Sequence, residues 1–301
     1  MSFSSFSTTR IVVTLLLFLV LGYGYRVLSS VPSDFPVGKN FTVEEGESLR
    51  SVSLRLKEQH YIHSALWFRA GVSFLGRDRH VQLGGYVFDS ALPLSGIVHK
   101  LVSGKPDVPL ISVTIPEGST TYEIAVLLRK ALPNFSIDIF GEKVFAAQAD
   151  GKLFPSTYFL LPSTDESRAV EIMTETFALR FSESFTGVTF PEVLPTKESV
   201  ISLAAILEGE AKTKNDMQIV SGILQKRLQI KMPLQVDVAP ETYRKNGLPL
   251  QPINNPGLVA IDAALHPTAS PYLYYLTGKD GTMHYAKTFE EHKKNIQKYL
   301  K

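Results

Sequence analysis

The clearest hydrophobic pattern of the chain lies between residues 196 and 211. Apolar residues recur there at the spacing of one helix face: Val200, Leu203, Ala204, Leu207 and Ala211. Pro195-Thr196 supplies a stop and an N-cap in front of this pattern, and neither proline nor glycine interrupts it before Gly209. The pattern predicts an amphipathic helix with one buried face.

Glu208 lies at the edge of this apolar face, with Ala204 and Ala205 one turn earlier and Ala211 after it. A carboxyl group held against small apolar side chains is partly desolvated, which raises its pKa. A raised pKa is what a general acid needs near neutral pH. The alternative interpretation is a solvated carboxylate at the boundary of an ordinary amphipathic helix.

Short strands and capped helices alternate along the rest of the chain, which predicts an α+β fold. An extended stretch from Met232 to Asp237 is expected to place Gln235 and Asp237 on one side of a strand. A hairpin is expected near the C-terminus, with a capped helix after it. The helices expected outside the Glu208 region cover residues 49–59, 122–131, 169–181, 216–227 and 258–265.

One strand-turn-helix pattern occurs twice, 72 residues apart. Glu45-Gly46 in the first copy matches Glu117-Gly118 in the second, and Ser48 matches Thr120 as the expected N-cap. Thr120 and Glu123 form a capping-box sequence. The pattern is similar to LysM modules, which fold as βααβ in about fifty residues and bind glycans that contain N-acetylglucosamine. The alternative is that Glu-Gly is merely a tight turn before a helix.

The N-terminal stretch from Ile11 to Tyr25 is uncharged and mostly aliphatic, with Arg10 and Arg26 on either side. This pattern predicts a single transmembrane helix over residues 10–30, because its length is near the minimum that spans a bilayer. Residues 1–9 would then be a cytoplasmic tail, and the chain after Ser30 would lie outside the cytoplasm. A cleaved signal peptide is the competing interpretation.

Composition narrows the class of protein. The chain has 301 residues, 44% of them hydrophobic, and a formal net charge of +2 without a basic run, so nothing indicates a nucleic-acid partner. Cysteine is absent, which excludes disulfides, thiolate metal sites, a cysteine nucleophile and a lipobox. The seven histidines form no metal-type pair, and phosphate-loop or serine-hydrolase motifs do not occur. The sequence predicts neither a metal nor a cofactor.

Longer motifs around Glu208 are more specific than the helix itself. The segments LAAILEGEA, GILQKRLQIKMPLQVD and GLPLQPINNPGLVAIDAALHP follow one another between residues 203 and 267. In this order they closely resemble the endolytic murein transglycosylase, or YceG-like, family, and the resemblance covers roughly residues 40–301. It implies a LysM-like module over residues 31–110 and a mixed α+β catalytic domain over residues 111–301.

The resemblance also implies an activity and a set of site residues. Members cleave MurNAc-β-1,4-GlcNAc bonds within nascent peptidoglycan strands and leave 1,6-anhydro-MurNAc ends, which limits strand length. Their catalytic glutamate falls on Glu208 and their second glutamate on Glu210. Glycan binding is expected from Gln235, Asp237, Tyr243, Asn255 and Glu210. The implied partners are glycan strands and the cytoplasmic membrane, with peptidoglycan synthases as candidates, and no nucleic acid.

The number of carboxylates bears on the reaction. A glycoside hydrolase uses two, whereas a lytic transglycosylase manages with one, since the C6 hydroxyl of the same sugar attacks C1. Glu210 is rotated about 200° around the helix from Glu208, so the two cannot share a cleft. Asp237 remains a second candidate. The alternatives are a muramidase-type hydrolase and a non-catalytic peptidoglycan-binding scaffold.

The chain departs from the family pattern after Asp237. Family members carry a longer insertion between this aspartate and the Gly-Leu-Pro motif, whereas here Tyr243 is followed almost directly by Gly247. A shortened loop beside the cleft affects the expected cleavage register and not the assignment of Glu208.

Overall fold

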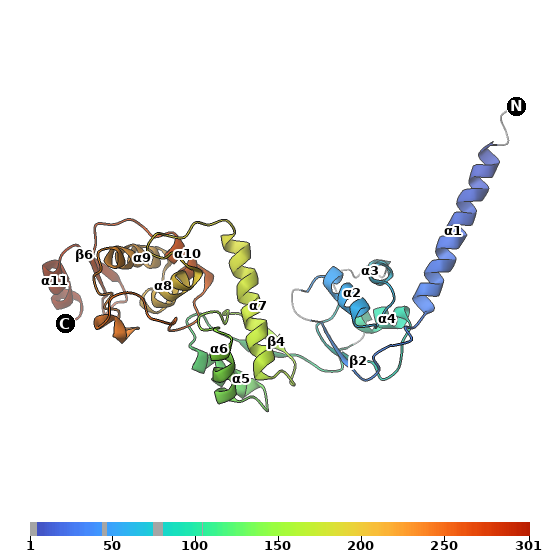
Figure 1. Ribbon diagram of the computed structural model, residues 1–301, viewed down its shortest axis with the longest axis horizontal. Helices are drawn as coiled ribbons and strands as arrows, with labels where there is room; N and C mark the ends of the chain where they lie inside the picture. The colour runs from blue at the N-terminus through green and yellow to red at the C-terminus, as the bar shows by residue number, and fades with distance from the viewer. Residues whose placement is uncertain (1–4, 44–46, 75–80, 104) are drawn as a thin grey trace. The chain divides into compact units, whose positions relative to one another are not determined.

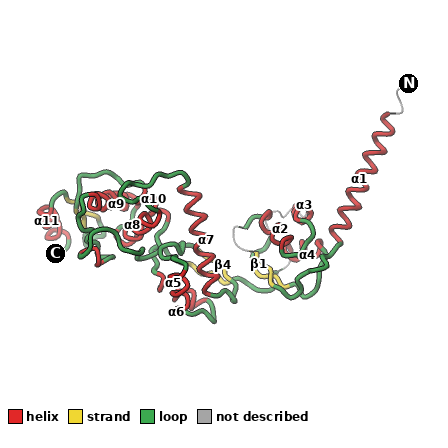
Figure 2. Tube along the Cα trace, viewed as in Figure 1, coloured by secondary structure: helices red, strands yellow, loops and turns green. Residues whose placement is uncertain are grey.

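The computed structural model describes residues 5–43, 47–74, 81–103 and 105–301. The chain divides into two compact units (Figure 1). The first unit comprises residues 1–112 and 159–162, and the second comprises residues 113–158 and 163–301. The expected α+β fold is confirmed, because helices predominate beside short two-stranded sheets (Figure 2).

The first unit is built on an antiparallel pair of strands, β1 (Asn40–Val43) and β2 (Gly84–Val87), in which Phe41 lies opposite Tyr86. Helices α2 (Leu49–Glu58) and α3 (Ala65–Phe74) connect the two strands, and α4 (Leu94–Ser103) follows them. Aromatic side chains fill the core between these elements because they bury the most apolar area per residue. The fully buried ones are Phe41, Tyr61, Phe68, Tyr86 and Phe88.

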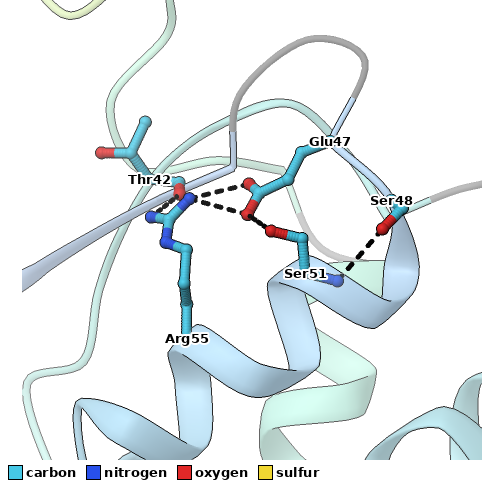
Figure 3. Close-up of polar contacts among 5 residues, drawn as sticks. All are labelled: Thr42, Glu47, Ser48, Ser51 and Arg55. Carbon is cyan, nitrogen blue, oxygen red and sulfur yellow. Dashed lines mark hydrogen bonds and ion pairs between the residues drawn. The ribbon is translucent and has the colours of Figure 1, made fainter.

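An ion pair fixes the entry into α2 (Figure 3). Arg55 Nη1 lies 2.8 Å from both carboxylate oxygens of Glu47, and its Nη2 donates to the carbonyl of Thr42 at 2.8 Å. Ser51 Oγ donates to the same carboxylate at 2.9 Å, while Ser48 caps the helix by accepting from the Ser51 N–H. Glu47 and Arg55 therefore tie strand β1 to helix α2 and serve the fold of the first unit.

The predicted transmembrane helix is wrong. A helix does form, α1 (Ser5–Ser29), but none of the helices in the described ranges is long and apolar enough to cross a membrane. Polar and small residues from Gly22 to Arg26 break the apolar sequence. The last turns of α1 also pack on the first unit: Val27 is buried in its core, and the ring of Trp67 lies against Gly24.

The chain from residue 111 repeats the succession of elements seen in the first unit. Strand β3 (Ile111–Thr114) is followed by α5 (Thr121–Ala131), α6 (Ile137–Ala146), β4 (Thr157–Leu160) and α7 (Glu166–Phe185), and β3 pairs with β4. The repeat extends further than predicted, since α4 and α7 also start 72 residues apart (94 and 166). The predicted capping box of Thr120 and Glu123 is confirmed. Glu45-Gly46 of the first copy lies outside the described residues.

Three helices form the core of the second unit: α8 (Lys197–Glu210), α9 (Lys214–Gln229) and α10 (Leu258–Leu265) (Figure 1). Helix α8 is buried on all sides from Val200 to Leu207, so it is more central than its predicted amphipathic pattern indicates. The predicted hairpin is confirmed as β5 (Tyr274–Thr277) and β6 (Met283–Ala286), and α11 (Phe289–Tyr299) closes the chain.

The strand predicted from Met232 to Asp237 does not form. Gln235 has a positive φ of 48°, and the chain turns back so that Val236 bridges Ala239. A 3-10 helix, η1 (Pro240–Tyr243), follows at once, and Thr242 Oγ1 accepts from the Val236 N–H at 3.1 Å. Buried and exposed side chains nevertheless alternate as expected for a strand: Leu234 and Val236 are buried, whereas Gln235 and Asp237 are exposed.

Candidate active site

Glu208 lies in the last turn of α8, next to the start of α10. Its Oε2 accepts a hydrogen bond of 2.9 Å from the backbone N–H of Gly257, the N-cap residue of α10. The 254–257 loop is tied to α8 a second time, because Asn254 Nδ2 donates to the carbonyl of Ala205 at 2.9 Å. The Asn-Asn-Pro-Gly turn therefore runs along α8 and holds the carboxyl group of Glu208 by one oxygen.

A second carboxylate lies beside this pair, and sequence reasoning missed it. Glu117 stands in the turn between β3 and α5, and its Oε1 is only 1.8 Å from the point where a Cβ on Gly257 would be. Gly118, with φ of +74°, brings the same turn against Glu208, since a Cβ there would lie 3.2 Å from Glu208 Cγ. The sequence does mark Glu117, because it belongs to the repeated Glu-Gly motif. From the sequence alone, this motif is interpreted only as a turn or as part of a glycan-binding module.

Asn255 locks the two turns together. The Gly118 N–H donates to the Asn255 carbonyl at 2.9 Å, and the Asn255 N–H donates to the Ser119 carbonyl at 3.0 Å. Its side chain donates to the same Ser119 carbonyl at 3.0 Å and accepts from the Leu153 N–H at 2.8 Å. Asn255 is 1% exposed. The predicted glycan contact of Asn255 does not fit this burial, and its role is to position the turn that carries Glu117.

The surroundings of Glu208 favour its protonated form. Burial raises the pKa of the Glu208 carboxyl, and the negative charge of Glu117 raises it further, while the hydrogen bond from the Gly257 N–H lowers it. The net direction is upward, as the sequence predicted for a general acid. Glu208 is half-buried, so the group is desolvated and still reachable.

A hollow of about 520 Å³ opens beside the Glu117 carboxylate. Its wall includes Glu117, Gly118 and the first turns of α5, with the ring of Tyr122, 67% exposed, at the rim. A larger hollow of about 710 Å³ lies against the first turns of α8 near Glu198 and Ser202, and neither Glu117 nor Glu208 lines it. Glu208 does not line the smaller hollow either, but two residues of its wall, Glu117 and Gly118, lie against the Glu208 site.

Glu210 points to a different neighbourhood from Glu208, as the helical rotation predicts. Its Oε2 accepts from the hydroxyl of Tyr275 at 3.1 Å. Burial raises the pKa of Glu210, an effect that the hydrogen bonds from Tyr275 and from the backbone of Val238 oppose. Nearby, the Tyr243 hydroxyl donates to Asp237 at 2.6 Å, which raises the pKa of Tyr243 to about 12.

The predicted site residues thus fall into two groups. Glu208 and Asn255 lie with Glu117 and Gly257, whereas Glu210, Asp237 and Tyr243 form a separate polar cluster that includes Tyr275. Gln235 is exposed in the turn before this cluster, close to the Thr242 carbonyl that accepts its N–H at 3.3 Å. In the part of the chain that the structure describes, no group of three or more His, Cys, Asp or Glu residues is arranged to hold a metal ion.

Arg227 borders the second cluster and has a structural role. Its guanidinium is buried, with Nε donating to the Leu273 carbonyl at 2.8 Å and Nη1 donating to the Leu234 carbonyl. These bonds connect α9 to the hairpin and to the turn before Gln235. The hydrogen-bond acceptors of Arg227 are thus backbone carbonyls.

The chain is similar to several known proteins along most of its length. A protein of Bacillus subtilis called endolytic murein transglycosylase is 27% identical, over 92% of this chain and 89% of its own length. A Streptococcus pneumoniae protein of the same name is 23% identical, and the match spans 96% of this chain but only 65% of that protein. The crystal structure of a yceG-like protein from Listeria monocytogenes shares the fold, with a TM-score of 0.54 at 23% identity, over 85% of this chain and 98% of that one. The model of the YceG-like family matches residues 41–240 and 241–298, and the chain belongs to this family.

Proposed function

We propose that this protein is an endolytic peptidoglycan lytic transglycosylase that cuts the MurNAc-β-1,4-GlcNAc bonds within glycan strands. The observation that carries the proposal is the placement of Glu208, which is half-buried, hydrogen-bonded to the Gly257 N–H and packed against the turn of Glu117 and Gly118. The names of the B. subtilis and S. pneumoniae relatives support the substrate and the reaction.

Glu208 acts first as an acid. Its proton goes to the bridging oxygen as the C1–O bond breaks, and the remaining carboxylate is stabilised by the Gly257 N–H that already donates to it. Glu208 then takes the proton of the C6 hydroxyl as that oxygen attacks C1 of the same sugar. The protonation state of Glu208 is restored and no water is consumed, so the new end is a 1,6-anhydro sugar. Intramolecular attack supplies much of the rate acceleration because both partners belong to one ring.

The position of Glu117 is the observation that favours the alternative function, a muramidase-type hydrolase. A muramidase-type hydrolase needs a second carboxylate to activate water or to attack C1, and Glu117 is the group beside Glu208 that could serve. The two reactions leave different ends, since hydrolysis adds a water and produces a reducing muramic acid. The end group therefore separates the two functions.

The test is a digestion of purified peptidoglycan strands with the full chain, followed by mass spectrometry. The proposal predicts internal cuts that shorten long strands, with ends one water lighter than hydrolysis products. Reducing ends would indicate the hydrolase. Binding without any shortening would indicate a non-catalytic scaffold.

We further infer that the first unit is a LysM-like module that holds the glycan strand. Its βααβ succession supports this, together with the Glu-Gly pattern of the sequence. Because peptidoglycan lies outside the cytoplasm, the catalytic unit would act there. Co-sedimentation with insoluble peptidoglycan tests the first inference: substitution of exposed residues of α2 and α3 should weaken binding, and unchanged binding would contradict it.

A further inference from the structure

Glu117 has no evident structural task. It is exposed, and among the described residues it has neither a hydrogen-bond nor an ion-pair partner. Glu123, six residues further on, shows the contrast, because its carboxylate accepts from the N–H and the hydroxyl of Thr120 in the capping box. The Glu117 carboxylate therefore lies beside the candidate acid without a partner in the described residues that would hold it in place.

Gly257 shows how closely Glu117 approaches the site. The backbone of Gly257 has φ of −77° and ψ of 171°, an extended conformation that any residue adopts. Conformational freedom therefore does not require glycine at this position. A Cβ would meet Glu117 Oε1 at 1.8 Å and its Cδ at 2.3 Å, so an alanine here would push the Glu117 carboxylate aside. The same residue donates its N–H to Glu208, so Gly257 lies between the two carboxylates.

The turn that carries Glu117 is rigidly placed. Three hydrogen bonds join residues 118–119 to Asn255, two between backbones and one from the Asn255 side chain. Gly118 accommodates the left-handed conformation of this turn at no steric cost. The position of Glu117 relative to Gly257 thus follows from the same contacts that build the site.

We propose that Glu117 is a positioning residue of the cleavage reaction, whose unpaired negative charge, acting across Gly257, keeps Glu208 protonated as the proton donor. This rests on the proposed function of Glu208 as the acid. The direction of the Glu208 pKa agrees, because the charge of Glu117 adds to the effect of burial. Ionising Glu208 next to a carboxylate that is already charged costs free energy, so Glu208 holds its proton to higher pH.

Charged groups on the neighbouring elements do not provide the same effect. On α8, Glu210 is directed to Tyr275, and on α9 the guanidinium of Arg227 is directed to backbone carbonyls. On α10 and α9, Asp262 pairs with Lys214 at 2.9 Å and with His266 at 2.9 Å. On α5, Glu123 is held by Thr120. Within the described part of the chain, Glu117 is the charged side chain whose field acts on Glu208.

The experiment is the pH profile of kcat/KM for strand cleavage by the full chain, compared between the wild type, Glu117→Gln and Glu117→Asp. The alkaline limb reports loss of the proton from Glu208. Glu117→Gln should move this limb to lower pH, so that cleavage on the limb falls about threefold to tenfold while the acidic plateau is retained. Glu117→Asp keeps the charge and should keep the limb near its wild-type position.

Two further variants separate charge from structure. Gly257→Ala keeps every charge but displaces the Glu117 carboxylate, so it should move the limb in the same direction as Glu117→Gln. Glu123→Gln removes a charge from the wall of the same hollow and should leave the limb in place. An unchanged limb in Glu117→Gln, or a uniform loss of rate without a shift, would overturn the proposal.

A readout that needs no activity distinguishes this proposal from the proposed function. The Glu208 carboxyl can be followed by carbon-13 NMR in glutamate-labelled full chain, with assignment by Glu208→Gln. Its titration midpoint should fall in Glu117→Gln, and an equal midpoint would refute the coupling even if strands are cleaved. If wild-type protein leaves strands intact while the midpoint falls, the proposed function fails and the coupling stands.

Discussion

The two repeats of this molecule use one arrangement of elements for different purposes. In the first, a strand, two helices and a second strand close around an aromatic core, and the acidic side chain at the helix entry, Glu47, is held by Arg55 and Ser51 (Figure 3). In the second, the turn before the helix is tied to the 254–257 loop. Its acidic side chain, Glu117, is the counterpart of Glu45 and not of Glu47, and it has no partner among the described residues and lies beside the Glu208 site.

Comparing the turns before α2 and α5 shows how such a turn can become part of a candidate active site. The caps of α2 and α5 are equivalent, with Ser48 and Thr120 each accepting from the residue three positions on. What differs is the partner of the turn. A neutralised carboxylate stabilises its own unit, whereas an unpaired one changes the protonation of a neighbour. Substitutions in the two turns should therefore have separable effects.

The largest effect is expected from Asn255→Ala, in the loop that holds the Glu117 turn of the second repeat. This change leaves the buried Leu153 N–H without an acceptor and removes the bond to the Ser119 carbonyl, which costs about 1–3 kcal/mol of unfolding free energy. Cleavage should fall as well, because the turns that position Glu117 and Gly257 separate. Thermal unfolding and strand cleavage measure the two losses. A stable variant with wild-type activity would show that this clamp is unimportant.

A smaller and different effect is expected from Arg55→Met in the first repeat. Methionine keeps much of the apolar stem but removes the ion pair with Glu47 and the bond to the Thr42 carbonyl, at a cost of about 1 kcal/mol. Hydrogen exchange should increase in peptides from residues 40–103 and stay unchanged in those from 113–301. The value of kcat should not change. A fall in kcat comparable to that of Asn255→Ala would remove the functional distinction between the repeats.

The smallest effect concerns the stability of Glu208→Gln as a function of pH. The pKa of Glu208 is raised in the folded protein, so its contribution to stability is complete below the unfolded pKa near 4.5 and is lost as pH rises through the folded value. Glutamine does not ionise. The variant should therefore be more stable than the wild type at pH 8, by about 0.5 kcal/mol, and the difference should vanish near pH 4. Urea unfolding at both pH values measures it, and the opposite trend would contradict a raised pKa.

The sequence was sufficient for most of the helices and for the hairpin, and it singled out Glu208 as the candidate acid. Helical spacing and the Thr196 cap located α8, and the Asn-Asn-Pro-Gly turn before Leu258 and the His266-Pro267 stop located α10. The strand at 232–237 failed because Gln235 adopts a left-handed conformation that alternation cannot reveal. The transmembrane helix failed where polar residues and the packing of Val27 and Gly24 on the first unit end the apolar run.

The second carboxylate could not be predicted for a different reason. Glu117 and Gly257 are 140 positions apart in the chain, and their approach depends on backbone bonds between two turns. Sequence reasoning looked for a partner of Glu208 on the same helix and in the adjacent motif, and so considered Glu210 and Asp237. The close contact with a glycine is a property of the folded chain.

The central claim is that Glu208 is the acid that cleaves glycan strands, and the most direct measurement compares wild type, Glu208→Gln and Glu210→Gln on purified strands. Glutamine keeps the shape and accepts the Gly257 hydrogen bond but cannot donate the proton. Strand cleavage by Glu208→Gln should fall roughly 10²–10⁴-fold at an unchanged or higher melting temperature, with a much smaller loss in Glu210→Gln. Cleavage by Glu208→Gln at the wild-type rate would contradict the account.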